Sequence, residues 1–386
     1  MIIEIRKAGF VNKGAELMLY AVLDKIREHY PSATFTMAPS YREGSEHFHK
    51  MTRLGFYPKA SFWQFGVQWG NLAAFMPKSI RDMCGLVLDR DVDIVLDAAG
   101  FAYSDQTSIK NSKELAHSSL RWKKNGTRTI LLPQAFGPFE KNETKELVKK
   151  WASRVDLIFA REPESYKYLT DLVGEQKKIK LYPDFTNLLQ GVLPISYDAS
   201  DKRIALVPNY RMVDRTNKQE SEAYLPFMIR CAKYLVEKEA QPFVVVHEGE
   251  NDRILAEKIS EAAGGIPIVT ETDPLHIKGI LGSCDATIGS RFHGLVSALS
   301  QGIPSLGTGW SHKYLRLFEN YDFKEGIVSV LDSDAVLEKK IDLLINPESA
   351  DKTRRKLEDI SKQQKKLSEE MWSIVFAEMD KVSRKK

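Results

Sequence analysis

Short apolar runs alternate with longer stretches of helical periodicity from one end of the chain to the other. Apolar residues three and four positions apart predict amphipathic helices, whereas short runs of β-branched residues are typical of buried strands. The runs predict strands at Ile2–Ile5, Thr34–Ala38, Asp93–Asp97, Thr129–Leu132, Asp156–Ala160, Arg203–Val207, Phe243–His247, Ile266–Val269, Ala286–Ile288 and Ser305–Gly307. The periodic stretches predict helices at Glu16–His29, Lys113–Lys124, Thr144–Arg154, Glu222–Lys238, Asp252–Ala263, Leu275–Gly282 and Leu295–Gln301. This alternation indicates βαβ units, and therefore parallel sheets with helices on both faces.

The alternation is interrupted near Gln190–Lys202, where Gly, Pro, Asp and Ser occur without periodicity. We therefore predict an N-terminal Rossmann-like domain over residues 1–190 and a C-terminal Rossmann-like domain over residues 203–346. From Pro347 onward the pattern predicts a long polar helix, a C-terminal extension over residues 347–386. In such an α/β protein of two doubly wound domains facing a cleft, ligands bind at the carboxyl ends of the strands.

The composition excludes several classes of protein. The 386-residue chain has 56 basic and 52 acidic residues, too small an excess of positive charge to indicate nucleic-acid binding. No apolar run approaches the roughly 18 residues of a transmembrane helix, and the N-terminus lacks the pattern of a secretory leader. Cys84, Cys231 and Cys284 lie far apart without CxxC spacing, which favours reduced thiols over disulfides or a zinc site. We therefore expect a cytoplasmic globular protein.

The segment Cys284–Gly309 carries the most informative chemistry. A predicted strand ends at Gly289 and Ser290, and Arg291 and His293 follow at the start of a helix. Backbone N–H groups at a helix start favour an anion, and an arginine adds a planar fork that suits carboxylate or phosphate. A histidine adds a proton that can move near neutral pH. The structural alternative is that Arg291 caps a carbonyl and His293 is a packing residue.

Around this turn the sequence SRFHGLVSALSQGIP resembles the R-x-H-G…G-I-P signature of the polysaccharide pyruvyl transferase family. Other segments resemble family motifs in the same order: Asn12–Glu16, Val92–Asp105, Leu132–Phe139, Ala160–Ser165 and Pro183-Asp184. The resemblance covers about residues 1–320, and its most specific parts are the R-x-H segment and the P-Q-x-x-G-P loop. At Ala98-Ala99-Gly100 this chain departs from the consecutive glycines of many members. The two methyl groups narrow the space for a ligand and favour a different acceptor shape.

The resemblance implies two Rossmann-like domains as in GT-B glycosyltransferases, with the acceptor on the N-terminal side and the donor on the C-terminal side. It implies transfer of a pyruvyl group from phosphoenolpyruvate onto a sugar as a ketal, with release of phosphate. Carried over from the R-x-H motif, Arg291 holds the donor's negative charge and His293 is the general acid. This scheme requires no metal ion, and no cofactor besides the donor substrate itself.

Other polar residues that end or follow predicted strands are weaker candidates for substrate binding. They are Asn12, Gly14, Glu16, Gln134, Arg161, His247, Ser290, His312 and Lys313. Most have a structural alternative, such as a helix N-cap, a tight turn or a solvated helix start. His247, or its neighbour Glu248, is placed to act on a sugar hydroxyl.

The stretch Ala60–Pro77 is uncharged and places apolar residues at helical spacing between Lys59 and Lys78. These residues are Phe62, Phe65, Trp69, Leu72 and Met76. The pattern predicts a buried helix, which we favour, or a surface that lies on a membrane or meets a lipid-linked acceptor. In the second case the protein is peripheral at the inner membrane face.

Two overlapping D-x-D patterns occupy Asp89–Asp93, and D-x-D is a metal-binding signal in a different glycosyltransferase fold. Here the carboxylates precede the predicted strand instead of following it, so they lie at the edge of the sheet away from ligands. A solvated loop is therefore the favoured interpretation.

Two other functions remain open from the sequence. One is a GT-B glycosyltransferase that uses a nucleotide sugar, although Leu295–Gln301 offers no carboxylate for a ribose. The other is a non-catalytic glycan-binding subunit. The sequence does not identify the acceptor sugar, its reacting hydroxyls, the general base or the oligomeric state.

Overall fold

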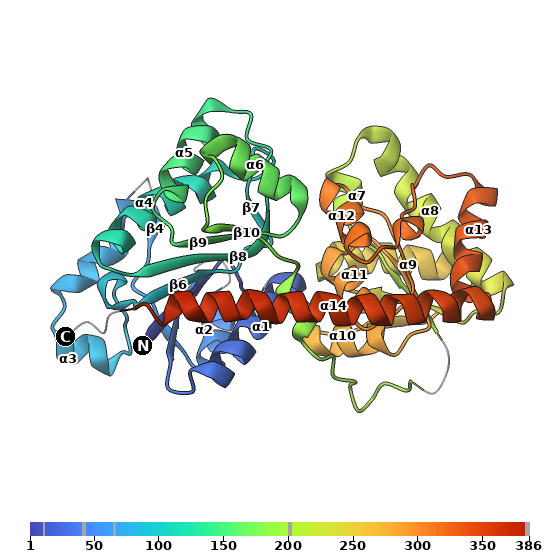
Figure 1. Ribbon diagram of the computed structural model, residues 1–386. Coiled ribbons are helices and arrows are strands. Elements are labelled where there is room, and N and C mark those ends of the chain that lie inside the picture. Colours follow the sequence, from blue (N-terminus) through green and yellow to red (C-terminus); the bar gives the residue numbers. More distant parts are fainter. Residues whose placement is uncertain (11, 41–43, 65–66, 200–202, 383–386) are drawn as a thin grey trace. The chain divides into compact units, whose positions relative to one another are not determined.

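The structure, a computed structural model, describes residues 1–10, 12–40, 44–64, 67–199 and 203–382 (Figure 1). The chain forms two compact units, of which unit 1 contains Met1–Asp184 with Glu369–Lys386 and unit 2 contains Phe185–Ser368. Each unit is built around its own parallel β-sheet.

The sheet of unit 1 has the strand order β10-β9-β8-β6-β1-β2-β3. Its strands are β1 (Ile2–Arg6), β2 (Thr34–Met37), β3 (Phe56–Pro58), β6 (Ile94–Asp97), β8 (Arg128–Phe136), β9 (Leu157–Ala160) and β10 (Ile179–Leu181), and β7 (Phe101–Tyr103) pairs with β8. Its helices are α1 (Lys13–His29), α2 (Gly44–Arg53), α3 (Lys78–Met83), α4 (Ile109–Lys124), α5 (Asn142–Ala152) and α6 (Pro163–Val173). After β1 the chain adds β2 and β3 on one side of the sheet, and after β6 it adds β8, β9 and β10 on the other side. The strand order therefore reverses between β1 and β6.

The sheet of unit 2 has the order β13-β12-β11-β14-β15, so its strand order reverses between β11 and β14. Its strands are β11 (Ile204–Val207), β12 (Pro242–Val246), β13 (Ile268–Thr270), β14 (Ala286–Gly289) and β15 (Ser305–Gly307). Its helices are α7 (Arg211–Asp214), α8 (Lys218–Glu237), α9 (Gly249–Ala262), α10 (Pro274–Gly282), α11 (Phe292–Leu299), α12 (His312–Asn320) and α13 (Asp334–Ile345), with 3₁₀-helices η3 (Phe185–Leu188) and η4 (Lys324–Gly326).

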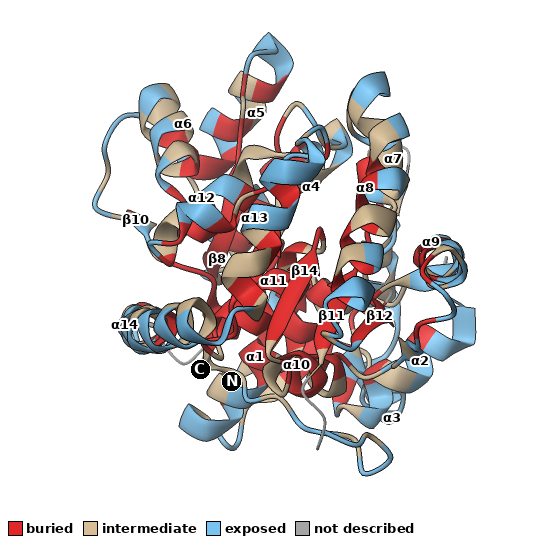
Figure 2. Ribbon diagram, turned by 90° about the vertical axis from the view of Figure 1, so that its right-hand side faces the viewer, coloured by how far each residue is buried: buried red, intermediate tan, exposed pale blue. Residues whose placement is uncertain are grey.

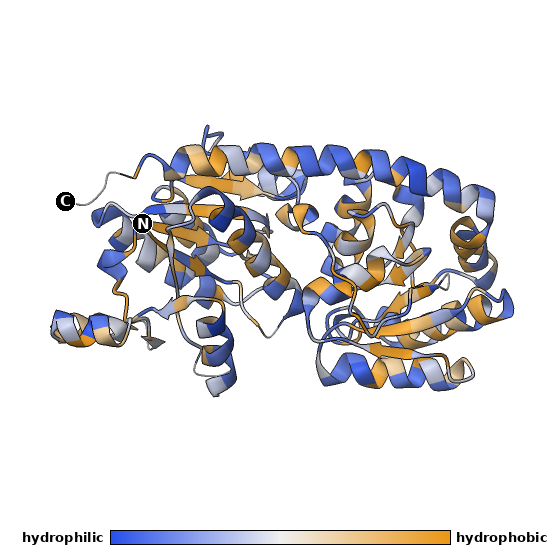
Figure 3. Ribbon diagram, turned by 90° about the horizontal axis from the view of Figure 1, so that it is seen from below, coloured by the Kyte–Doolittle hydropathy of each residue, from blue (hydrophilic) through white to orange (hydrophobic). Residues whose placement is uncertain are grey.

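The strands at the centre of each sheet are apolar because both of their faces are covered. Every residue of β6, β11 and β14 is buried, and Figure 2 shows β8, β11 and β14 in the colour of buried residues. Figure 3 shows the same contrast as hydropathy, with apolar strands inside and polar helix surfaces outside. Parallel strands covered on both faces require continuous apolar runs, which is why these strands are visible in the sequence.

The last helix, α14 (Pro347–Met379), contributes to both units, which divide it between Ser368 and Glu369. Within unit 2, Leu357 is fully buried in an apolar cluster. Within unit 1, Trp372 is 1% exposed and Phe376 stacks on His29 with ring centroids 4.0 Å apart. The predicted long polar helix is confirmed and ends at Met379, while residues 383–386 lie outside the described part of the chain.

Outside Ala60–Pro77, each predicted strand and helix overlaps one of the same type in the structure, with ends shifted by a few residues. The three-residue strands β3, β7 and β10 were not predicted, whereas β13 and β15, of the same length, were. Across the described residues, no helix is both long and apolar enough to cross a bilayer.

The favoured prediction for Ala60–Pro77, a buried helix, is wrong. The stretch forms a small antiparallel ribbon, β4 (Trp63–Gln64) and β5 (Val67–Gln68), followed by the 3₁₀-helix η1 (Trp69–Phe75). Its apolar side chains are exposed at Phe62, Trp69, Leu72 and Met76, and the predicted member Phe65 lies outside the described residues. Polar groups set the turn instead, since the buried Gln68 amide oxygen accepts from the Phe62 and Gly70 backbone nitrogens.

The prediction of a solvated loop at the D-x-D patterns is also wrong for Asp89, which is 8% exposed within the 3₁₀-helix η2 (Asp89–Asp91). Its carboxylate lies 2.6 Å from the Lys59 ammonium and 2.8 Å from the Arg121 guanidinium. Burial would raise the pKa of Asp89, but these two cations lower it on balance. The carboxylate is therefore an anion that serves the internal structure of unit 1.

Candidate active site

In unit 2 the candidate residues gather where the strand order reverses. Val207 at the end of β11 lies in register with Gly289 at the end of β14, and ligands of open parallel sheets bind at such a reversal. Ser290 and Arg291 follow β14 directly, and His247 follows β12, the neighbour of β11. His312 and Lys313 open α12 shortly after β15, the neighbour of β14.

Ser290 is fully buried, and three other residues hydrogen-bond to its carbonyl or its side chain. The Tyr314 hydroxyl donates to the Ser290 carbonyl at 2.9 Å, and the Asn209 amide donates to the same oxygen at 2.6 Å. The Tyr224 hydroxyl bonds to Ser290 Oγ. These contacts hold the turn that sets the direction of α11, so Ser290 orients the helix start that carries Arg291 and His293.

Arg291 is bound by two carboxylates of the neighbouring loop and helix. Its Nε and Nη2 lie 2.8 and 2.6 Å from the oxygens of Asp252, which is fully buried. Its Nη1 donates to Glu248. Burial would lower the pKa of Arg291, but the hydrogen bonds and charge of Asp252 and the charge of Glu248 raise it on balance. Arg291 is therefore a permanent cation that ties the β12–α9 loop to the start of α11.

His293 lies in the first turn of α11 with its ring perpendicular to that of Phe292, at a centroid distance of 5.3 Å. The next residue, Gly294, has no side chain, and other residues approach its Cα closely. A Cβ at Gly294 would lie 3.5 Å from His247 Cδ2 and 3.4 Å from Arg291 Cβ. His247 thus packs against the start of α11, beside Arg291.

Lys313 belongs to the same group of residues. Its ammonium lies 5.1 Å from the ring centroid of Phe292, 4.8 Å from that of Trp310 and 5.4 Å from that of Tyr314. Such contacts with aromatic faces favour the cation, and the contact with Phe292 places it beside the residue that precedes His293. His312 is its neighbour in the chain and opens α12.

Unit 1 carries a second polar cluster at its own strand reversal, where Arg6 of β1 lies in register with Asp97 of β6. Arg6 Nε lies 3.0 Å from Asp97 Oδ2, and the Tyr103 hydroxyl donates to the same oxygen at 2.6 Å. Burial lowers the pKa of Arg6, but the charges of Glu114 and Asp97 raise it on balance. Fully buried, Asp97 is the centre of this cluster.

Two predicted residues join this cluster. The Gln134 side chain donates from Nε2 to Asp97 Oδ1 at 3.3 Å. The backbone carbonyl of Gln134 accepts from the backbone nitrogen of Arg161 at 3.1 Å. The Gln134 side-chain oxygen is buried and has no hydrogen-bond partner among the described residues. The Arg161 guanidinium lies 2.9 Å from Asp184, and both side chains are 4% exposed.

The three candidates after β1 serve the start of α1. Asn12 is its N-cap, and its side-chain oxygen accepts from the backbone nitrogens of Gly14 and Ala15 at 2.8 and 3.1 Å. Glu16 is buried and lies 2.9 Å from the Lys13 ammonium. The capping alternative for Asn12 is thus realised in the structure, and a binding role for Asn12, Gly14 and Glu16 stays a prediction.

Sequence reasoning missed Arg6, Asp97, Asn209 and Asp252. Arg6 and Asp97 had one visible signal, since each is a charged residue at the end of a mainly apolar strand, IIEIR and IVLD. Asn209 and Asp252 gave none, because their importance comes from contacts with Ser290 and Arg291 across the sheet.

The model of the polysaccharide pyruvyl transferase family matches residues 12–312. No curated protein sequence matches the chain. Among solved structures, a putative UDP-N-acetylglucosamine 2-epimerase from Listeria monocytogenes is similar with a TM-score of 0.63 and 12% identity, covering 100% of this chain and 98% of its own. HepE of Anabaena in complex with UDP and glucose gives a TM-score of 0.60 at 10% identity, covering 97% and 99%. UDP-GlcNAc 2-epimerase from Neisseria meningitidis bound to UDP-GlcNAc gives the same four values.

At these identities the structural likeness establishes the fold alone. The relatives are GT-B-fold epimerases and glycosyltransferases, so the predicted fold class is confirmed.

Proposed function

Because the chain belongs to the polysaccharide pyruvyl transferase family, we propose that it transfers a pyruvyl group from phosphoenolpyruvate onto a sugar of a polysaccharide or its precursor. The product is a ketal, and phosphate is released. The observation that carries this proposal is the group of His293, Arg291, His247 and Lys313 around the start of α11, where unit 2 reverses its strand order.

The proposed reaction begins with proton transfer from the His293 imidazolium to C3 of phosphoenolpyruvate. The cationic centre formed at C2 is attacked by a sugar hydroxyl, whose proton passes to His247 or Glu248. A second hydroxyl of the same sugar then attacks C2 as the C2–O bond to phosphate breaks, so phosphate leaves with the second proton. Both hydroxyl oxygens end on C2, and no electrons are gained or lost.

Fixed cations are needed to hold a donor that carries both phosphate and carboxylate. Arg291 has five N–H groups, and its three hydrogen bonds to Asp252 and Glu248 use one N–H each on Nε, Nη1 and Nη2. We propose that its two other N–H groups contact the donor, together with Lys313, His312 and the backbone N–H groups at the start of α11. The carboxylates keep the guanidinium plane fixed while it does so.

The acceptor is assigned to unit 1 in this proposal. We propose that the Gln134 side-chain oxygen, buried without a hydrogen-bond partner among the described residues, accepts from a sugar hydroxyl. Arg161, Asn12, Gly14 and Glu16, which lie at or after the ends of β9 and β1, are the other proposed contacts. We propose a lipid-linked acceptor as one candidate, with the enzyme peripheral to the membrane that holds it.

The test is phosphate release from phosphoenolpyruvate in the presence of galactose-, mannose- and glucose-containing acceptors, free and lipid-linked, with the mass gain of the product as a second readout. His293→Ala should lower turnover by about 10²–10⁴-fold, the usual contribution of a general acid, while its thermal unfolding stays that of the parent. His276→Ala is the matched control, since His276 is a half-buried histidine of α10 in the same unit. Equal turnover in His293→Ala and parent would contradict the assignment.

A second candidate function also has one observation in its support, because structural relatives bind UDP and UDP-sugars. A nucleotide-sugar glycosyltransferase of this fold would bind its diphosphate at the start of α11 as well. The sequence of α11, FHGLVSAL, has no carboxylate for the ribose hydroxyls, which favours the pyruvyl transferase. Calorimetry with UDP-sugars and with phosphoenolpyruvate separates the two, and tight sugar binding without phosphate release would favour a non-catalytic subunit.

A further inference from the structure

Residues 60–64 and 67–83 of unit 1, here named the apolar segment, carry large apolar side chains that lie at the surface. The exposed fractions are 43% for Phe62, 48% for Val67, 45% for Trp69, 57% for Leu72, 86% for Phe75, 37% for Met76, 41% for Ile80 and 78% for Met83. None of the residues of η1 is buried. A run of exposed apolar side chains of this size marks an interaction surface.

Specific contacts hold the segment in this exposed form. The buried Gln68 side chain accepts from Gly70 N at 3.2 Å and donates to Ser61 Oγ at 2.8 Å. A Cβ at Gly70 would lie 2.2 Å from the carbonyl oxygen of Ala60, so the chain can close here only with a glycine. The buried Arg81 donates from Nε to the Met76 carbonyl at 3.3 Å. These hydrogen bonds and the close approach at Gly70 therefore fix the segment in a conformation that exposes its apolar side chains.

The 3₁₀ geometry of η1 sorts its side chains into separate edges. Residues three apart in a 3₁₀-helix lie one above the other, so Trp69, Leu72 and Phe75 form one exposed apolar edge. Asn71 and Ala74 form a neighbouring edge, and both of them line a pocket of about 280 Å³. The apolar edge and the pocket are thus two sides of the same helix.

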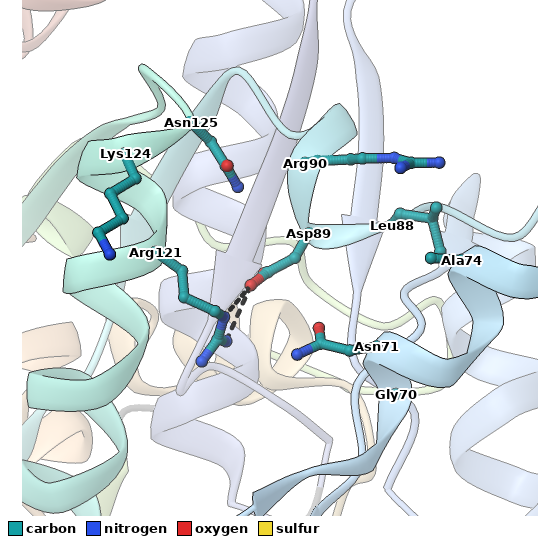
Figure 4. A pocket seen from close by; sticks show the side chains of 9 residues that line it. All are labelled: Gly70, Asn71, Ala74, Leu88, Asp89, Arg90, Arg121, Lys124 and Asn125. Carbon is teal, nitrogen blue, oxygen red and sulfur yellow. Dashed lines mark hydrogen bonds and ion pairs between the residues drawn. The ribbon is translucent and has the colours of Figure 1, made fainter.

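This pocket is basic. Besides Asn71 and Ala74, its lining contains Gly70, Leu88, Asp89, Arg90, Arg121, Lys124 and Asn125, that is, three cations against one anion. Figure 4 shows Asn71 and Asn125 directed toward the Arg121–Asp89 pair, with Lys124 beside Arg121 on α4. Arg121 Nη1 is buried and has no hydrogen-bond partner among the described residues. The pKa of the nearby His117 is lowered by burial and by the charge of Arg121, against the opposing charge of Asp89.

Aromatic and aliphatic side chains next to a cationic pocket are complementary to one kind of partner, a bilayer with anionic headgroups. The apolar edge matches the boundary between headgroups and acyl chains, and cations beside it match the negative potential of anionic lipids. A guanidinium with an unused N–H and two carboxamides suit the oxygens of a headgroup phosphate.

We propose that the apolar segment and the basic pocket together bind the surface of an anionic phospholipid bilayer. Trp69, Leu72 and Phe75 enter the interface, and Arg121, Lys124 and Asn125 bind a headgroup phosphate. This inference stands on unit 1 alone and does not depend on the proposed reaction.

The test is flotation of the full-length protein with vesicles of phosphatidylcholine alone and with a third of phosphatidylglycerol, at low and high salt, without donor or acceptor. We expect binding to the anionic vesicles that weakens at high salt. The double variant Arg90→Glu with Lys124→Glu should weaken binding by about tenfold or more, since each cation near such a surface contributes appreciably. Phe75→Ser with Met83→Ser should weaken it at both salt concentrations, because the loss is apolar.

Matched controls carry the same changes at exposed positions of unit 2. They are Lys233→Glu with Lys258→Glu for charge, and Ile195→Ser with Leu331→Ser for apolar exposure. The proposal is overturned if neither vesicle binds, if the patch variants bind like their controls, or if binding is the same without phosphatidylglycerol. Self-association in light scattering that is lost in Phe75→Ser, without vesicle binding, would instead assign the surface to a second copy of this chain.

Discussion

What a residue of unit 2 can do depends on the residues that it contacts, and Arg291 is the clearest case. Ion pairs with Asp252 and Glu248 compensate its charge, and the R-x-H pattern gave no sign of these two carboxylates. A sequence shows which residue types follow a strand, so Ser290, Arg291 and His293 were predictable. It does not show which carboxylate from another βα loop will meet a guanidinium, because strand order decides that.

The first prediction concerns the ion pair of Arg291 and Asp252. Asp252→Asn removes the buried carboxylate charge and should destabilise the protein by about 3 kcal/mol, since it breaks a buried ion pair and leaves Glu248 alone to compensate Arg291. Urea unfolding of the full chain measures the change. Asp214→Asn is the control, because Asp214 pairs with Arg211 at the surface of the same unit, where an ion pair contributes about 0–1 kcal/mol. A loss below about 1 kcal/mol for Asp252→Asn would contradict a stabilising role.

At the scale of elements, the sequence was most reliable where both faces of a strand are covered, as in β6, β11 and β14. It failed in the apolar segment for a physical reason. The predicted positions Phe62, Phe65, Trp69, Leu72 and Met76 are spaced by three and four, which fits one face of an α-helix. In the 3₁₀-helix that forms instead, residues three apart align, so Trp69 and Leu72 share an edge with Phe75. Periodicity also cannot state which face a neighbouring element will cover, so exposed and buried helices give the same pattern.

Helix α10 gives the second prediction. Alanine is a better helix former than glycine by about 1 kcal/mol, but a Cβ at Gly279 would lie 2.3 Å from the Val192 carbonyl oxygen. Gly279→Ala should therefore destabilise the protein by about 1–3 kcal/mol through overpacking, against its helix propensity. Thermal unfolding measures the change.

The matched control lies in the same helix. A Cβ at Gly282 would meet the end of the Gln301 side chain, which can move aside more easily than backbone. Gly282→Ala should therefore cost less than Gly279→Ala. If both variants stabilise the protein to the same extent, propensity alone governs α10 and the close approach is not rigid.

At the scale of the whole molecule, the pattern predicted two α/β halves and a final helix, but not how that helix is used. Sparse apolar positions in a long polar helix do not reveal their partners. The structure assigns Glu369–Lys386 to the unit that begins at Met1, and joins the two ends of the chain through contacts such as Lys25 with Glu369 at 2.8 Å.

Trp372 gives the third prediction. Trp372→Ala should cost about 3–5 kcal/mol, the range for truncating a fully buried aromatic residue, and the loss should fall on unit 1. Differential scanning calorimetry should then resolve an early transition ahead of the main one. Leu367→Ala, at a position 38% exposed on the same helix, should leave the profile nearly unchanged. A uniform shift of one transition for Trp372→Ala would show that the units unfold together.

The shared helix also fixes an order for biosynthesis. A ribosome makes the protein from its first residue, yet the segment that completes unit 1 emerges last, after all of unit 2 has been translated. The nascent N-terminal half must therefore wait, with its site for Trp372 open to water, until the last turns of α14 have been made. A chain that ended at Ser368 would carry all of unit 2 beside a unit 1 that lacks its last segment.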